Sequence, residues 1–382
     1  MNTFFLLLCL LLPLLLLTGC DTTGPDDETI AGVDVDRLFV PPTAAELAAI
    51  EADWAGRDVS VQGFVTEQDT LLAGDPFGGP ATTVRVVSHT VGGVRHYGAV
   101  IAPEDAAARS LPVLLYLHGD DAGVDTDSES EVMLALQLAP ALRSQFVIVV
   151  PSFRSETLRA GGRAYRSGGD PSPWDYDVDD ALALLNAALA SSPAADPARI
   201  GALGFSRGAT VAMLAAVRDP RIELVVAFFG PTNFQGAFAR QLTEQALRSE
   251  LPDLPGIDHL DDAYLQPLKA GTTGYDAVRL ALIRRSPLAF AGRLPQLQLH
   301  HGTADTVVPV TESEALDAVL RAAGRTAPGY EFYRYPGGGH HPLFLSGSLD
   351  RTGAFLSRLL PHAARVPFAV AFHARRTTNG RR

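Results

Sequence analysis

Residues 201–210, "GALGFSRGAT", place Ser206 between Gly204 and Gly208 in the pattern G-x-S-x-G. An apolar run precedes the pattern and an alanine-rich run follows it, so the serine lies where a strand turns into a helix. In so sharp a turn, side chains two residues before and after the serine would collide, which explains both glycines. The turn leaves the serine hydroxyl exposed above the sheet. Because so short a pattern also arises by chance, a nucleophilic serine needs further partners.

Strands and helices alternate on both sides of this turn. Continuous apolar runs at 112–119 ("PVLLYLHG") and 146–151 ("FVIVVP") are typical of strands buried on both faces of a parallel sheet. Two β-rich runs about a Gly-Gly pair predict a hairpin over 83–103. The pattern predicts an α/β fold, with a doubly wound, mainly parallel sheet and helices on both faces. The helical stretches are expected at 174–190, 311–324 and 350–360.

A serine hydroxyl needs a base to accept its proton and a carboxylate to orient that base. Asp305 lies in "HHGTADTVVP" (300–309), directly after a predicted strand. His340 lies in the glycine-rich "YPGGGHHPL" (335–343), after another strand, and His341 is the alternative base. All three groups follow carboxyl ends of strands, where open α/β sheets place their sites. The sequence therefore predicts Ser206, Asp305 and His340 as a catalytic triad.

Acyl transfer also requires two donors for the oxygen that becomes negative in the tetrahedral intermediate. We expect the first to be the backbone N–H of Arg207, the residue after the nucleophile. The second candidate is the backbone N–H of Asp120, which follows "LYLHG" in the loop after an earlier strand. The Asp120 carboxylate would oppose negative charge if it turned inward.

The motifs "LYLHG", "GFSRG", "HHGTADTVVP" and "GGGHH", in this order, resemble the catalytic domain of the prolyl oligopeptidase family within the α/β-hydrolase superfamily. The resemblance covers residues 83–362 and implies the same three residues as the triad. It implies a serine hydrolase that forms an acyl-enzyme. An ester is the favoured substrate, a short peptide is the second, and a non-catalytic binding protein on the same scaffold is the alternative of another class. The preceding stretch is too short for the β-propeller that the family's peptidases usually carry.

A partly helical insertion is predicted at 234–290, between two strands, and it could act as a lid over the site or serve the structure alone. Residues 41–82 form an N-terminal extension of the hydrolase domain. We expect neither a cofactor nor a metal. The sequence has no G-x-G-x-x-G fingerprint, and the acidic stretch 120–131 lacks the glycine and terminal glutamate spacing of a calcium loop.

The N-terminus is typical of an export signal. Residues 4–17 form an apolar run that is short for a membrane span, and "LTGC" at 17–20 resembles the bacterial lipoprotein signal. This predicts a signal peptide at 1–19, lipidation of Cys20, an acidic tether over 20–40, and attachment of an exported protein to a membrane of the cell envelope. An ordinary secretory signal remains the alternative.

Charge excludes one class of partner. The formal net charge is −12 and the sequence pI is about 5.3, whereas binding to nucleic acid needs a basic face. Only the C-terminal stretch at 363–382 is basic, and we interpret it as a solvated tail.

Overall fold

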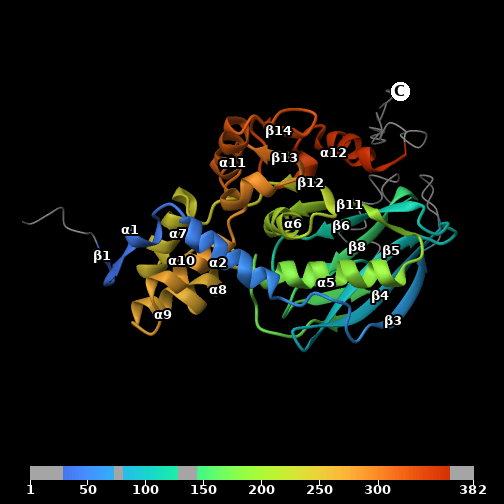
Figure 1. Ribbon diagram of the computed structural model, residues 1–382, viewed down its shortest axis with the longest axis horizontal. Coiled ribbons are helices and arrows are strands. Elements are labelled where there is room, and N and C mark those ends of the chain that lie inside the picture. Colours follow the sequence, from blue (N-terminus) through green and yellow to red (C-terminus); the bar gives the residue numbers. More distant parts are fainter. Residues whose placement is uncertain (1–28, 73–80, 128–143, 362–382) are drawn as a thin grey trace, which may run out of the picture.

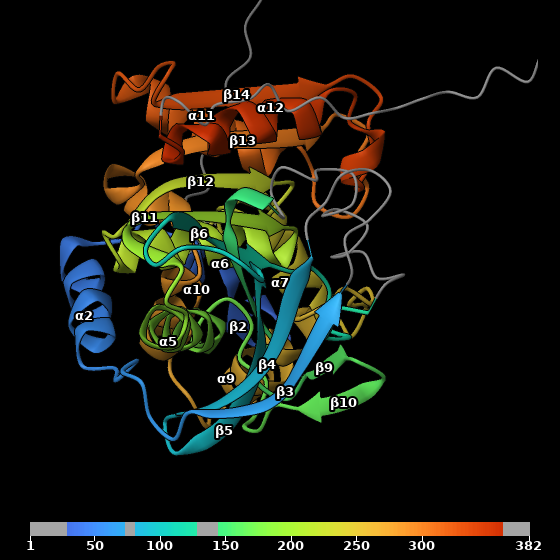
Figure 2. The ribbon, with the colours of Figure 1, turned by 90° about the vertical axis from the view of Figure 1, so that its right-hand side faces the viewer.

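A computed structural model describes residues 29–72, 81–127 and 144–361. Its centre is a nine-stranded sheet in the order β14-β13-β12-β11-β6-β8-β5-β4-β3 (Figure 2). Six strands at one side are parallel and three at the other are antiparallel, which confirms the predicted mainly parallel sheet. The parallel strands are β6 (Leu111–Leu117), β8 (Val147–Pro151), β11 (Ala195–Phe205), β12 (Ile222–Phe228), β13 (Gln296–Gly302) and β14 (Tyr330–Tyr335); the others are β3 (Val65–Leu72), β4 (Thr82–Val91) and β5 (Val94–Pro103).

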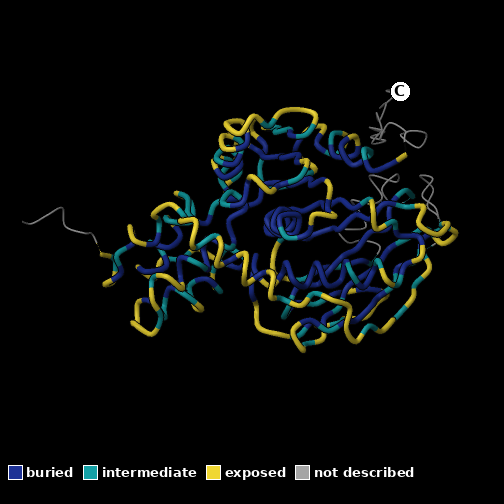
Figure 3. The backbone as a smooth tube through the Cα atoms, viewed as in Figure 1, coloured by how far each residue is buried: buried dark blue, intermediate teal, exposed yellow. Residues whose placement is uncertain are grey.

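Helices cover both faces of the sheet because successive strand residues point to opposite sides. On one face, α5 (Tyr176–Ser191), α6 (Arg207–Arg218) and α11 (Thr311–Ala322) pack against strand residues such as Val113 and Leu115. On the other face, α12 (Ser348–Leu356) and the short helix η4 (Ser357–Leu359) pack against the intervening residues, such as Leu114. The tube in Figure 3 shows α5, α6 and the central strands as the buried interior.

The predicted insertion at 234–290 is helical. It contains α7 (Ala237–Leu247), α8 (Ile257–Leu260), η1 (Asp261–Leu265), α9 (Gln266–Lys269) and α10 (Tyr275–Arg284), and η2 (Pro287–Arg293) leads back to the sheet. These helices form a lobe beside the sheet (Figure 1). Within the described residues, no helix has the length and apolar character needed to cross a membrane.

The N-terminal segment differs from the prediction. Residues 20–40 were expected to be a tether, but those from 29 onward are folded as β1 (Thr29–Ile30), β2 (Val33–Asp34) and α1 (Val35–Leu38). Val33, Val35 and Leu38 are buried in the core beside the helical lobe. Between them, Asp34 is half-buried and Asp36 is exposed, so the acidic composition of this segment gives no indication of its apolar face.

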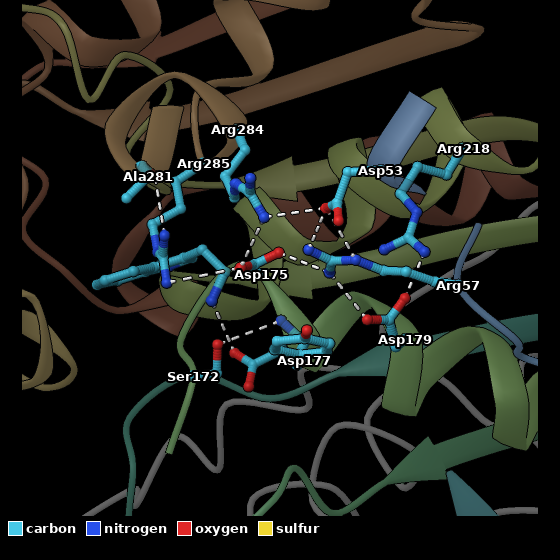
Figure 4. Close-up of polar contacts among 12 residues, drawn as sticks. Asp53, Arg57, Ser172, Asp175, Asp177, Asp179, Arg218, Ala281, Arg284 and Arg285 are labelled. Atoms are coloured by element: carbon cyan, nitrogen blue, oxygen red, sulfur yellow. Dashed lines mark hydrogen bonds and ion pairs between the residues drawn. The ribbon is translucent and has the colours of Figure 1, made fainter. Parts of the chain in front are cut away.

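Helix α2 (Ala44–Ala55) follows, and a capping box between Thr43 and Glu46 fixes its start. A network of ion pairs ties this helix to the rest of the molecule (Figure 4). Arg57, directly after α2, contacts Asp175 at 2.7 Å and Asp179 at 2.9 Å, both at the start of α5. Asp179 also pairs with Arg218 of α6.

Three short strands on the outside of the molecule were not predicted. They are β7 (Val124–Asp125), β9 (Thr157–Ala160) and β10 (Arg163–Arg166), which form a separate three-stranded sheet. Strand β10 carries two arginines in four residues and little apolar character, so its sequence gives no strand pattern.

Candidate active site

Ser206 occupies the turn between β11 and α6. Its backbone has φ 51° and ψ −119°, a strained conformation for a residue with a side chain. Its N–H donates to the carbonyl oxygen of Phe228 at 2.9 Å, which holds the turn against β12. A Cβ on Gly204 would lie 2.1 Å from the Gly208 carbonyl oxygen, and one on Gly208 would lie 2.1 Å from that of Leu117. Both glycines are therefore required by close backbone contacts, as the pattern indicated.

Asp305 and His340 form a hydrogen-bonded pair. The Nδ1–H of His340 donates to Oδ2 of Asp305 at 2.7 Å, and Oδ1 of the same carboxylate accepts from the backbone N–H groups of Val307 and Val308 at 2.9 and 3.0 Å. Burial favours the neutral carboxyl, but hydrogen bonds from His301 and His340 outweigh it and hold the pKa of Asp305 well below its usual range. The site thus holds an ionised carboxylate against the imidazole.

The pairing distinguishes the two candidate histidines. A carboxylate only accepts, so Nδ1 of His340 carries the proton and Nε2 of the neutral ring is left as a base. The ring of His340 also packs on Phe229, with 4.3 Å between centroids. His341 instead accepts from the N–H of Leu343 through its Nδ1 at 3.2 Å and packs against Phe344. His341 therefore caps the short helix η3 (Pro342–Phe344).

Ser206 and His340 line one open cleft at the carboxyl end of the sheet. Gly119 and Asp120 of the loop after β6 line it too, with an empty volume of about 990 Å³ that includes open solvent. The predicted nucleophile, base and oxyanion loop, which are far apart in the sequence, are thus brought together. Asp305 supports His340 from the buried side.

The loop after β6, which contains Gly119 and Asp120 and is called the oxyanion loop here, holds the Asp120 carboxylate by a hydrogen bond of its own. This residue has φ 65°, and its carboxylate accepts from the N–H of Asp121 at 2.6 Å. Hydrogen bonds from that backbone are the main cause that lowers the pKa of Asp120. The carboxylate is thus engaged by its own loop. The two backbone donors of Arg207 and Asp120 remain a prediction.

Sequence reasoning missed the side chain of Arg207. It is almost fully buried and donates to Asp177 through Nε and Nη2, both at 2.8 Å, and to Glu156 through Nη1 at 2.5 Å. The same Nη1 donates to the carbonyl oxygen of Asp120 at 3.2 Å, which ties the oxyanion loop to α6. Asp177 lies in the first turn of α5, where an aspartate is also explained by the helix dipole, so the sequence contained no specific signal.

Glu156 lies between Arg207 and a buried histidine. Its Oε2 is 3.3 Å from Nε2 of His118, whose Nδ1–H donates to the carbonyl oxygen of Gly119 at 2.8 Å. Burial raises the pKa of Glu156 to about 8, with Arg207 opposing the rise and Asp177 adding to it. Burial lowers the pKa of His118 to about 4. Although Oε2 of Glu156 and Nε2 of His118 lie close together, neither has a hydrogen-bond partner among the described residues.

A second, apolar cavity adjoins the cleft at Ser206. It extends into the helical lobe with an empty volume of about 880 Å³, the solvent at its mouth included. Ser206, Val307, Leu254 and Pro255 line both spaces. The structure therefore places the serine at the junction of an open, mixed cleft and an apolar cavity.

The described residues contain no group of three or more His, Cys, Asp or Glu side chains that could hold a metal ion. Part of the acidic stretch at 120–131 lies outside the described residues.

A model of the prolyl oligopeptidase family matches residues 134–359, more than half of the chain, which therefore belongs to this family of serine hydrolases. Among solved structures, acetyl xylan esterase 1 of Thermoanaerobacterium sp. JW/SL YS485 superimposes with a TM-score of 0.57 and 16% identity, over 86% of this chain and 98% of that one. An acetyl xylan esterase of Paenibacillus sp. R4 gives a TM-score of 0.50 and 17% identity, over 80% and 93%. These likenesses show a shared fold.

A curated thiohydrolase of Arthrinium phaeospermum is 37% identical over 79 residues. The aligned part is 20% of this chain and 24% of the thiohydrolase, so the chain matches only about a quarter of that relative's length.

Proposed function

We propose that this protein hydrolyses carboxylic esters through an acyl-enzyme formed on Ser206. The main support is the 2.7 Å hydrogen bond between Asp305 and His340, because the His340 ring lines the same cleft as Ser206. Nε2 of His340 takes the Ser206 hydroxyl proton as Oγ attacks the carbonyl carbon. The backbone N–H groups of Arg207 and Asp120 stabilise the resulting oxyanion.

The imidazolium then donates its proton to the leaving oxygen, the bond to that oxygen breaks, and the acyl group stays on Ser206. Water enters on the leaving-group side, gives its proton to His340 and attacks the acyl carbon. Collapse of the second tetrahedral intermediate returns the proton to Oγ and releases the acid. Asp305 keeps the ring in the tautomer that both halves of the cycle need.

The leaving group is proposed to be an alcohol or a thiol. The local similarity to a thiohydrolase supports including thioesters. Membership of a family named for an oligopeptidase supports a short peptide as the second candidate. Parallel assays with p-nitrophenyl esters, acyl thioesters and aminoacyl amides distinguish these leaving groups, because only a peptidase releases amine from the amides.

We also propose that the protein is exported and anchored to a membrane by lipid on Cys20. The signal and Cys20 lie outside the described residues, so the sequence of residues 4–20 is the support. Expression of the full chain with and without Cys20→Ser, followed by membrane fractionation, tests this. Loss of membrane association in the variant supports the anchor, and equal partition of both proteins contradicts it.

Labelling with a fluorophosphonate and peptide mapping test the nucleophile. Ser206 is expected to be labelled stoichiometrically, and Ser206→Ala to abolish the label. Ser110→Ala, at an exposed serine outside both cavities, is the matched control and should label as the wild type does. Folded wild-type protein that takes no label would contradict the proposed function and favour the non-catalytic alternative.

A further inference from the structure

The apolar cavity is built mainly by the helical lobe. One face of α7 contributes Phe238, Leu242 and Ala246, which recur at four-residue spacing along the helix. Loops at the carboxyl end of the sheet add Pro231, Val307 and Val308. Most of the other lining residues come from the loop after α7, from α8, η1 and α10, and from the segment before α5. These residues are chiefly Leu251, Leu254, Ile257, Leu260, Tyr264, Leu265, Val278, Leu282 and Trp174.

The charged residues at this cavity are already paired. Of the described residues that line it, Arg207 and Glu312 are charged. The guanidinium of Arg207 is held by Asp177 and Glu156, and Oε2 of Glu312 accepts from the backbone N–H groups of Thr232 and Asn233 at 2.8 and 2.9 Å. Both charged groups are thus held by neighbouring protein groups, and most of the other lining residues are apolar. The surface that remains is suited to hydrocarbon.

The position of His340 decides which part of a substrate enters this cavity. His340 must donate a proton to the leaving group, so the leaving group lies on its side of Ser206. Among the described residues, His340 lines the open cleft and is not among those that line the apolar cavity. The leaving group therefore occupies the cleft, and the acyl group points into the cavity.

We propose that the cavity within the helical lobe is an acyl-chain pocket, which makes the enzyme selective for esters or thioesters of hydrocarbon acids longer than acetate. The proposal rests on the proposed function, because it assigns the acyl side from the roles of Ser206 and His340. The helical lobe then supplies most of the apolar wall of the pocket, to which loops of the sheet add Pro231, Val307 and Val308.

Ala246 offers a way to fill the pocket. It is 1% exposed and lies on the lining face of α7, so a larger side chain there takes space from an acyl chain. Gln241 lies on the exposed face of the same helix and outside the lining. Ala246→Trp and Gln241→Trp therefore introduce the same side chain into one helix, inside and outside the pocket.

The first experiment measures kcat/KM for p-nitrophenyl acetate, butanoate, hexanoate and octanoate. Each added methylene that is buried contributes about 0.8 kcal/mol, so we expect kcat/KM to rise about threefold to fourfold per methylene until the pocket is full. Ala246→Trp should lower the ratio of the octanoate to the acetate value of kcat/KM at least about tenfold. Gln241→Trp should match the wild type. A wild-type preference for acetate would overturn the proposal.

The second experiment does not depend on turnover or on tolerance of a tryptophan at position 246. Trp174 lines the pocket, whereas Trp54 lies on α2 outside its lining. Titration of Ser206→Ala protein with 8-bromooctanoic acid should quench Trp174 fluorescence saturably through the bromine. The additional substitution Trp174→Phe should remove the saturable quenching.

The two readouts separate the pocket from the catalysis. Quenching without any ester turnover by the wild type would overturn the proposed function and retain an apolar ligand pocket. Turnover confined to acetate, without quenching, would overturn the acyl pocket and leave the proposed function standing. Absence of both ester turnover and quenching would overturn the proposed function and the acyl-chain pocket together.

Discussion

The guanidinium of Arg207 and the carboxylate of Asp177 form two parallel hydrogen bonds of 2.8 Å, directly behind the turn that carries Ser206. The pair joins the first turn of α6 to the first turn of α5. Asp177 also accepts from the N–H of Trp174 at 2.9 Å, at the entrance to the helical lobe. One buried ion pair therefore connects the turn that carries Ser206, the oxyanion loop and the acyl-chain pocket.

Removal of the Arg207 side chain should be strongly destabilising. Arg207→Met leaves Asp177 and Glu156 buried without their cation, and loss of one partner from such a pair costs about 3–5 kcal/mol. Urea denaturation measures this as a fall in the free energy of unfolding. Arg207→Lys keeps the positive charge but cannot form the bidentate hydrogen bonds. Its free energy of unfolding should therefore lie between those of the wild type and Arg207→Met. A change below about 1 kcal/mol in the methionine variant would contradict this account.

Asp305→Asn should reduce kcat by about 10⁴-fold while the protein stays folded. The amide oxygen of asparagine can still accept from the Val307 and Val308 N–H groups, but its NH₂ group does not stabilise the imidazolium of His340. His341→Ala is the comparison: His341 also lines the cleft, but it caps a short helix and has no contact with Asp305, so its kcat should fall far less, by about threefold at most. Steady-state ester hydrolysis measures both. Equal losses in the two variants would remove the distinction between the histidines.

The close contacts at Gly208 give a backbone prediction. In Gly208→Ala, the new Cβ would meet the carbonyl oxygen of Leu117 at 2.1 Å, so α6 must shift away from β6 and carry Ser206 with it. A displacement near 1 Å at a nucleophile costs about 10²-fold in rate. Gly292→Ala, where a Cβ meets no atom within 4 Å, should leave the rate unchanged. The rates of fluorophosphonate labelling compare Gly208→Ala with Gly292→Ala. A normal rate in Gly208→Ala would show that the turn can accommodate a Cβ beside the Leu117 carbonyl oxygen.

The ion pairs of Arg57 should stabilise far more than an exposed pair. Arg57→Met removes one of the cations that face Asp175 and Asp179, both 3% exposed, while Arg284 and Arg218 stay beside them, so we expect a loss of about 1–3 kcal/mol. Arg85→Met removes an exposed pair with Asp69 and should cost about 0–1 kcal/mol. Chemical denaturation of both variants measures the difference. Similar losses would mean that α2 is held to α5 by other contacts.

The sequence predicted those parts of the site that depend on local backbone geometry. Gly204 and Gly208 are required by contacts within one turn, and Asp305 and His340 follow strand ends that the apolar runs indicate. The Arg207 network was missed because Glu156 and Asp177 are joined to it only by the tertiary fold. Residues 29–40 were misassigned for a related reason, since their few apolar residues have a core to enter only once the distant lobe has folded.

The raised pKa of Glu156 predicts that stability falls as the pH rises from about 4.5 to about 8. The pKa is about 8 in the folded protein, against an ordinary value of 4.5, because burial disfavours the charged carboxylate. Between these two values the folded state keeps a proton that the unfolded state releases, so protonation favours folding. The contribution is fully present below about pH 4.5 and is lost, at up to about 1.4 kcal/mol per pH unit, as the pH rises through 8.

Glu156→Gln isolates this contribution. The glutamine oxygen can still accept from Arg207 and its NH₂ group carries no charge, so the variant mimics the protonated, neutral carboxyl group at every pH. We expect its free energy of unfolding to change less than that of the wild type between pH 5 and 9, as measured by denaturant titration at each pH. Parallel curves for the two proteins would mean that Glu156 is already ionised at pH 5, with Arg207 compensating its burial in full.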